Sequence, residues 1–187
     1  MKIRLASELQ IDSIVDGEGI RTVIWTQGCP HNCPSCHNPN THDFSGGFLE
    51  EVDNIISDLR CLKGQAGITF SGGDPMCQPE ACALIASAAK ELGYNIWCYT
   101  GYTYEQLMIL AKGKKAILDF LNNIDVLVDG KFVLAEKSLD LKFKGSRNQR
   151  VIDIPKSLTE KKLCLLDDYE NPIDNTFRYQ KEANMFL

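Results

Sequence analysis

Residues 21–38, RTVIWTQGCPHNCPSCHN, decide the fold, because an apolar segment here runs directly into a cysteine-rich loop. Residues 21–27 are rich in β-branched and aromatic side chains and have a glycine near each end, which predicts a buried β-strand. The loop then places Cys29, Cys33 and Cys36 in a C-x3-C-x2-C pattern. We therefore expect a strand that delivers three thiols to the carboxyl end of a sheet, where α/β sheets bind their ligands.

Strands and helices alternate on the carboxyl side of this loop. Further strands are predicted at residues 67–71, 95–100, 125–128 and 150–154, with 163–166 as an additional candidate. Helices are predicted at residues 49–59, 79–93 and 105–122, the last weakened at Gly113. This alternation favours parallel pairing through right-handed crossovers. The predicted fold class is α/β: a single domain over residues 1–187 that forms an incomplete (β/α) barrel of mainly parallel strands.

The composition limits the class of protein. With 187 residues, 44% of them hydrophobic, the chain is long enough for one core and too short for two independent domains. No apolar run reaches the roughly 18 residues of a membrane span, and the N-terminus lacks the order of a signal peptide. We therefore expect a cytoplasmic protein with no membrane partner. The net charge of −5 comes from interspersed charges, which argues against a nucleic-acid partner.

Four motifs follow four of the predicted strands. They are the cysteine loop, SGGDP at residues 71–75, YTGY at 99–102 and DGK at 129–131. Because parallel strands bring their carboxyl ends to one edge, all four segments are expected to face the same rim. This convergence predicts a binding site there.

Three cysteines in one short loop leave two alternatives for a bound metal. A structural zinc site would add His31 or His37 as the fourth ligand, although zinc modules normally supply two separated pairs of ligands. A 4Fe-4S cluster normally takes four cysteines, so three would leave one iron open to a substrate or cofactor. The other cysteines have no ligand spacing and are predicted to be buried free thiols: Cys61, Cys77, Cys82, Cys98 and Cys164.

The cysteine motif belongs to an ordered set of segments that resembles a known family. The set comprises DGEGIRT (16–22), CHN (36–38), SGGDP (71–75), WCYTGYT (97–103), VLVDGKF (126–132) and GSRNQRVIDI (145–154). Over residues 11–154 the chain is similar to the radical S-adenosylmethionine enzymes that activate glycyl radical enzymes. The resemblance is closest to the branch that serves anaerobic ribonucleotide reductase.

The resemblance implies an oxidoreductase with the partial barrel of radical S-adenosylmethionine enzymes. It implies a 4Fe-4S cluster on Cys29, Cys33 and Cys36, with S-adenosyl-L-methionine chelating the fourth iron. One electron from a low-potential donor then cleaves the cofactor to methionine and a 5'-deoxyadenosyl radical, which takes a hydrogen atom from a glycine of the partner. That partner is the glycyl radical subunit of the anaerobic (class III) ribonucleoside-triphosphate reductase. Two alternatives stay open: an activase of a pyruvate formate-lyase type enzyme, and a non-catalytic zinc-binding interaction module.

The resemblance also implies the residues that bind the cofactor, and it assigns no side chain to the chemistry itself. They are Ser35, Cys36, His37, Ser71, Gly72, Gly73, Asp74, Asp129 and Lys131. The paired glycines permit a close backbone approach, and alternate positions put Asp129 and Lys131 on one face of an extended chain. From the residues alone, SGGDP and DGK could equally be ordinary turns, and His37 a packed histidine.

Three positions depart from the family pattern. Asp74 replaces a longer glutamate, and Ser35 replaces an aromatic residue that packs beside adenine, which leaves adenine recognition to the backbone near Cys36 or to His37. Tyr99 stands where the formate-lyase type has an acidic ligand for a cation. The last departure puts a cation site in doubt and favours the reductase branch.

Overall fold

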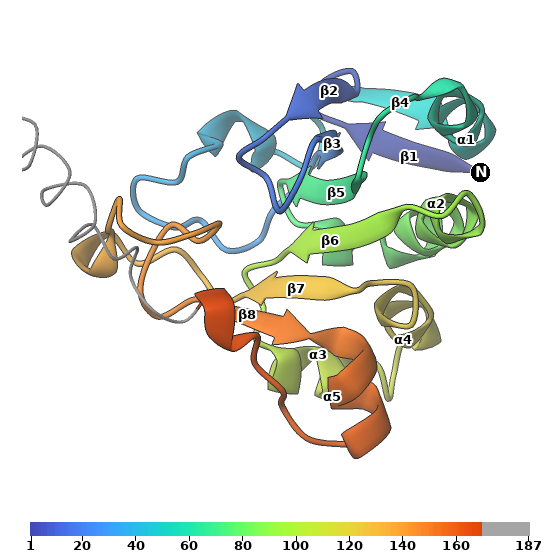
Figure 1. Ribbon diagram of the computed structural model, residues 1–187. Helices are drawn as coiled ribbons and strands as arrows, with labels where there is room; N and C mark the ends of the chain where they lie inside the picture. The colour runs from blue at the N-terminus through green and yellow to red at the C-terminus, as the bar shows by residue number, and fades with distance from the viewer. Residues whose placement is uncertain (170–187) are drawn as a thin grey trace, which may run out of the picture.

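Four parallel strands form the centre of one sheet in the computed structural model, which describes residues 1–169 (Figure 1). The strands in sheet order are β4 (Phe48–Glu51), β1 (Lys2–Leu5), β3 (Arg21–Thr26), β5 (Gly67–Gly72), β6 (Asn95–Tyr99), β7 (Val126–Asp129) and β8 (Arg150–Asp153). Strand β2 (Gln10–Ser13) pairs with β3 beside this path. The predicted single domain also includes residues 170–187, which lie outside the described residues.

The central strands β3, β5, β6 and β7 confirm the predicted α/β class with mainly parallel central strands. Strands β3 and β5 stay in register over six residues, from Arg21 opposite Gly67 to Thr26 opposite Gly72. Their carboxyl ends are therefore level. The loops that follow the arrowheads of these strands gather on the left of Figure 1, so the predicted shared rim is confirmed.

The edges of the sheet are antiparallel, which the sequence did not predict. Strands β1, β2 and β4 pair antiparallel within the amino-terminal part, and β8 runs antiparallel to β7. Strand β8 follows a long loop that turns back over the rim, and an antiparallel neighbour needs no crossover helix. The candidate strand at 163–166 forms only an isolated bridge between Leu165 and Ile152.

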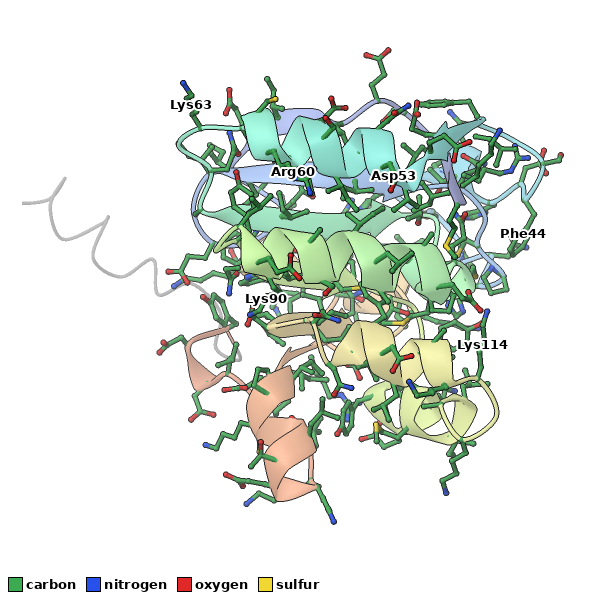
Figure 2. All side chains as sticks on the ribbon, turned by 90° about the vertical axis from the view of Figure 1, so that its right-hand side faces the viewer. Phe44, Asp53, Arg60, Lys63, Lys90 and Lys114 are labelled. Carbon is green, nitrogen blue, oxygen red and sulfur yellow. The ribbon has the colours of Figure 1, made fainter. Side chains whose placement is uncertain are left out.

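Helices cover one face of the sheet, as the ribbons of α1, α2 and α4 in front of the strands show in Figure 2. The helices are α1 (Val52–Cys61), α2 (Pro79–Glu91), α3 (Tyr104–Leu110), α4 (Lys115–Leu121) and α5 (Ile154–Glu160). Short 3-10 turns are η1 (Pro39–Thr41), η2 (Pro75–Cys77), η3 (Leu134–Glu136) and η4 (Asp167–Tyr169). The predicted helix at 105–122 is two helices, because the chain leaves helical geometry around Gly113. None of the helices in the described part is long and apolar enough to cross a membrane.

The two faces of the sheet bury different residues. Ile68 and Phe70 of β5 belong to the main core with the helices, whereas Trp97, Val126 and Val128 pack in a second cluster with half-buried Tyr99. This is the alternation expected of strands whose successive side chains point to opposite faces. The second face, which carries no α1, α2 or α4, is therefore open to loops from the rim.

The isolated cysteines are free thiols, as predicted, but not all are buried. Cys82, Cys98 and Cys164 are buried, and Cys77 is half-buried in η2. The prediction is wrong for Cys61, which is exposed at the last residue of α1, where the helix leaves the core.

A buried arginine ties the segment before β3 to the sheet. Arg21 donates to the hydroxyl of Thr69 (2.7 Å) and to the carbonyl oxygens of Ile68 and Asn95 (2.8 Å each). Its guanidinium also bonds the carbonyl of Glu18 at 2.9 Å and lies over the ring of Trp97. Burial lowers the pKa of Arg21 to about 10. The arginine of the DGEGIRT motif therefore has a structural role at the amino end of β3.

Replacing Arg21 by leucine should lower the free energy of unfolding by about 3 kcal/mol or more, because each buried acceptor left without a donor costs about 1–3 kcal/mol. Urea unfolding of wild type and variant measures this difference. The control is Arg60→Leu on the outer surface of α1, where the side chain is exposed (Figure 2), and it should change stability by less than about 0.5 kcal/mol. Equal effects of both substitutions would contradict the structural role of Arg21.

Candidate metal centre

The cysteine loop leaves β3 at Gly28 and is closed at its base by backbone hydrogen bonds. The N–H of Gly28 donates to the carbonyl of Thr41 at 2.8 Å, and the N–H of Cys29 donates to the carbonyl of His42 at 3.1 Å. A tight turn within the loop brings the N–H of Cys36 to the carbonyl of Cys33 at 3.2 Å. Cys29, Cys33 and Cys36 are all half-buried free thiols.

The surroundings of Cys29 disfavour a bare thiolate at this position. Burial raises the pKa of Cys29, and the nearby Asp74, Cys33 and Cys36 raise it further. A hydrogen bond from the backbone N–H of His31 acts in the opposite direction. A cationic metal centre would supply the charge that stabilises the deprotonated sulfurs, because ligation and deprotonation are coupled. The donor set therefore fits a metal or an iron–sulfur cluster.

One backbone N–H group of the loop donates to a cysteine sulfur. The N–H of Asn38 lies 3.3 Å from Sγ of Cys36. Hydrogen bonds to the sulfurs help to set the potential of an iron–sulfur cluster. The loop thus has a built-in group that can tune a cluster.

The two histidines of the zinc alternative make contacts of their own. Nε2 of His31 lies 2.7 Å from a carboxylate oxygen of Asp74, and the His37 ring lies 4.9 Å from that of Phe132. Among residues 1–169, no three His, Cys, Asp or Glu side chains are grouped so that they could hold one metal ion.

The glycines of SGGDP lie against the base of the cysteine loop. The N–H of Gly73 donates to the carbonyl of Thr26 at 2.7 Å, and the N–H of Asp74 donates to the carbonyl of Gly28 at 2.9 Å. A Cβ added to Gly73 would lie 2.4 Å from the carbonyl oxygen of Gly28. The glycines of this motif were predicted to allow a close backbone approach to a ligand. They also allow a close approach to the backbone of the cysteine loop.

Asp74 is fully buried and its carboxylate is surrounded by donors of the chain. It accepts from the hydroxyl of Thr100, from the N–H of Gly101 and from the N–H of Met76, each at 3.0 Å. Nε2 of His31 lies 2.7 Å away. Asp74 thus joins the cysteine loop, SGGDP and YTGY in one hydrogen-bond network. Its carboxylate oxygens, which were predicted to contact the cofactor, accept hydrogen bonds from groups of the chain itself.

Asp129 and Lys131 are placed differently from the prediction. Asp129 is buried and accepts from the N–H of Tyr104 at 2.7 Å and from Nε of Arg150 at 3.0 Å. Gly130 has φ +95°, so the chain turns between Asp129 and the exposed Lys131. The expectation that both lie on one face of an extended chain is therefore wrong, because a left-handed glycine stands between them.

Arg150 also forms an ion pair with Glu105, and the strength of this contact at the rim depends on pH. Hydrogen bonds from Arg150 lower the pKa of Glu105 to about 2 from its ordinary value of 4.5. A depressed pKa adds stability that is complete above pH 4.5 and is lost as the pH falls toward 2. Because the Glu105 side chain is 56% exposed, solvent screening limits the contribution to at most about 1 kcal/mol.

Glu105→Gln should therefore unfold at a lower temperature than wild type at pH 6 and at nearly the same temperature at pH 2.5. Thermal unfolding of both proteins at the two pH values measures the difference between their unfolding temperatures. Because all other titrating groups are the same in both proteins, their effects cancel in this difference. A gap of the same size at both pH values would contradict the ion pair with Arg150.

A cavity of about 400 Å³ opens on the face of the sheet that α1, α2 and α4 leave uncovered. Of the predicted cofactor-binding residues, His37 and Ser71 line it. The others do not: Ser35, Cys36, Gly72, Gly73, Asp74, Asp129 and Lys131. Its walls also contain Trp25 and Tyr99, and burial raises the pKa of the Tyr99 phenol. Trp25 was not predicted to be a site residue. It stands between two buried residues of β3, so its side chain points to the opposite face of the sheet from theirs, and this alternation could have identified it.

Comparisons with known proteins bear on this site. A family model described as a 4Fe-4S single cluster domain matches residues 15–152. An anaerobic ribonucleoside-triphosphate reductase-activating protein of Salmonella typhi is 39% identical over 146 residues, which cover 74% of this chain and 91% of that protein. A pyruvate formate-lyase-activating enzyme of Clostridium pasteurianum is 35% identical over 118 residues, or 60% of this chain and 50% of that enzyme.

Among solved structures, the crystal structure of QueE from Escherichia coli aligns with a TM-score of 0.46 at 14% identity, covering 55% of this chain and 54% of that one. The matched family model, in contrast, spans the cysteine loop together with all the rim motifs described above.

Proposed function

The chain belongs to the family of anaerobic ribonucleoside-triphosphate reductase-activating proteins, and from this premise we propose that it installs a glycyl radical on the anaerobic (class III) reductase. The observation that carries the proposal is the closed loop with Cys29, Cys33 and Cys36 at the carboxyl end of β3. The loop borders a cavity large enough for a small cofactor. The protein is an oxidoreductase of the radical S-adenosylmethionine type.

The three thiolates would hold a 4Fe-4S cluster, which when bound supplies one-electron reductive cleavage of S-adenosyl-L-methionine to methionine and a 5'-deoxyadenosyl radical. The chain's own contribution is to hold and shield the reacting atoms. Trp25 and Tyr99 wall the cavity from one side. Large aromatic walls of this kind limit the access of water from their side and so help to protect a reactive intermediate.

The cofactor contacts follow from what borders this cavity. Ser71 and His37 line it directly, and we assign them to the cofactor. Gly72 and Gly73 would approach it through their backbone, with Ser35 and Cys36 contributing from the loop. Lys131 is exposed and free to reach the methionyl end, whereas Asp129 and Asp74 would act by holding neighbouring segments in place.

The partners follow from the reaction. The glycyl radical subunit of the reductase supplies the glycine, and a low-potential donor supplies the electron. We propose that this exchange takes place in the cytoplasm, without nucleic acid or membrane, and within a single domain over residues 1–187. The uncovered face of the sheet, where the cavity opens, is the side from which the partner's glycine would enter.

Anaerobic reconstitution with iron and sulfide tests the proposal. The purified protein should take up about four irons and four sulfides per chain and, with dithionite and S-adenosylmethionine, should release 5'-deoxyadenosine. Uptake of zinc without sulfide would overturn the proposal in favour of a zinc-binding interaction module. A pyruvate formate-lyase-activating enzyme is also among the relatives. The same preparation should therefore be tested with a formate-lyase type enzyme as a second target.

A further inference from the structure

We propose that Ile14 and Val15, in the loop between β2 and β3, form the docking surface for the glycine-bearing segment of the reductase subunit. We call this pair of residues the apolar ridge. The inference rests on the proposed function, because it concerns the partner of the same site. It is carried by the exposure of the two side chains, by the way their loop is fastened to the sheet, and by the two hollows that they border.

Both side chains of the apolar ridge face solvent. Ile14 is 70% exposed and Val15 is 71% exposed, and Ile20 at the end of the same loop is 46% exposed. None of the three belongs to the main core or to the second apolar cluster. Single exposed aliphatic side chains are ordinary, whereas several in one loop beside a cavity are typical of an interaction site.

The loop that carries the apolar ridge is fastened on both sides of it. The hydroxyl of Ser13 donates to the carboxylate of Asp16, and the hydroxyl of Thr69 in β5 donates to the carbonyl of Asp16 at 2.7 Å. Farther along the loop, Arg21 donates to the carbonyl of Glu18 at 2.9 Å. A ridge held in this way needs little further ordering when a partner binds, which favours its use as a docking surface.

Gly17 brings the loop onto the uncovered face of the sheet. Its φ is +124°, and an added Cβ would lie 2.8 Å from the ring of Trp97 in β6. The left-handed conformation and the close approach both call for glycine here. In Figure 1 the loop that links β2 to β3 lies on the left, with the other rim loops. The apolar ridge therefore stands beside the cavity and away from the helices that cover the other face.

The apolar ridge borders two hollows. Val15 lines the cavity of about 400 Å³ to which we assign the cofactor, and Ile14 lines a second hollow of about 600 Å³. Phe143 lines both of them. A chain segment that crosses the apolar ridge can therefore place one residue in the first hollow and a neighbouring side chain in the second.

The proposed reaction decides which partner fits this surface. Removal of a hydrogen atom needs direct contact, so the partner's glycine must enter the cavity itself. Glycine has no side chain that could bind there, so the residues next to it must supply the affinity. Those residues would lie on the apolar ridge, which calls for apolar side chains beside the glycine.

The second hollow adds a requirement on the same segment. Its wall contains Ile14, Ile20 and Phe143, which fit a large apolar or aromatic side chain a few residues from the glycine. Glu18 and Lys142 stand in the same wall and can meet polar groups of the segment's backbone. The partner surface is therefore an apolar segment around a glycine.

The test follows glycyl radical formation by EPR while the concentration of the reductase's glycyl radical subunit is varied. The reconstituted protein, S-adenosylmethionine and dithionite are kept constant. Ile14→Ser should raise the half-saturating concentration of the subunit about tenfold, the effect of losing one well-buried contact in an interface. The rate at saturation should stay at its wild-type value, as expected when binding alone is weakened. Adding Val15→Ser should raise the half-saturating concentration further.

Ile109→Ser is the matched control. Ile109 is 65% exposed, nearly as much as Ile14, but it lies on α3 and lines neither hollow. Its replacement should leave the half-saturating concentration unchanged. Ile14→Ser and Ile109→Ser should both keep the wild-type unfolding temperature, because substitutions of exposed side chains have small effects on stability.

Every other occupant of the apolar ridge gives a different result. A lower unfolding temperature for the isolated Ile14→Ser protein, without one for Ile109→Ser, would show that the chain covers the ridge itself. A sedimentation coefficient changed by Ile14→Ser in the absence of the reductase would assign the ridge to a second copy of the chain. Either result would overturn the inference.

Failure of the inference is distinguishable from failure of the proposed function. If wild type formed the glycyl radical and Ile14→Ser had the same half-saturating concentration, the inference would be overturned and the proposed function would stand. Wild-type protein that formed no glycyl radical on the reductase at any concentration would overturn both together.

Discussion

Replacing Cys33 by alanine should abolish formation of 5'-deoxyadenosine. We expect the rate to fall by more than about 100-fold, because even the loss of a group that only supports a metal ligand can lower activity by up to about 100-fold. Cys33 is one of three half-buried thiols on the loop after β3, and the remaining two would leave a second iron of the cluster without a cysteine ligand. Product released from S-adenosylmethionine under anaerobic reduction, together with iron and sulfide per chain, measures the effect.

Cys61→Ala is the matched control for this loss. Cys61 is exposed at the end of α1, away from the cysteine loop, so its replacement should leave iron content and product formation at wild-type levels. A Cys33→Ala protein that still cleaved the cofactor would show that the ligand assignment is wrong.

Gly73→Ala should cause the second large loss, although it removes no ligand. The added Cβ would meet the carbonyl oxygen of Gly28 at 2.4 Å and its carbonyl carbon at 2.8 Å. Backbone atoms cannot move aside as a flexible side chain can, so the base of the cysteine loop must shift. A misplacement of about 1 Å can cost about 100-fold in rate, and we expect product formation to fall by that order.

The control for this change is Gly113→Ala, in the connection between α3 and α4. A Cβ there would meet only the carbonyl oxygen of Leu110 at 3.8 Å, which is an ordinary contact. This substitution should be neutral or stabilise the protein by about 0.4–1 kcal/mol through the unfolded chain. If the Gly73→Ala and Gly113→Ala proteins had the same iron content and the same rate of product formation, the packing of SGGDP on the cysteine loop would not be needed for activity.

The parallel centre of the fold was predictable from local sequence. Residues 21–27, 67–71, 95–100 and 125–128 combine β-branched and aromatic side chains with glycine or turn residues at their ends, and all four form central strands. The antiparallel edges were not predictable in the same way. Strands β1, β2 and β4 have four residues each, which is too short for a clear alternation, and their pairing depends on tertiary contacts.

The candidate site was predictable as a set of motifs but not as a set of contacts. The order of the rim segments followed from the parallel strands. The roles of single residues did not: Asp74 is used by His31 and Thr100, and Asp129 by Arg150. Both carboxylates bond donors distant in sequence, which no local pattern reveals. The cofactor contacts stay predictions.

The central claim is that this chain makes a glycyl radical on anaerobic ribonucleoside-triphosphate reductase. The most direct measurement is EPR of the reductase after anaerobic mixing with the reconstituted protein, S-adenosylmethionine and dithionite, beside a parallel sample with a formate-lyase type enzyme. We predict a glycyl radical doublet on the reductase, none on the formate-lyase type enzyme, and none with Cys33→Ala. A doublet on the formate-lyase type enzyme with none on the reductase would contradict the claim.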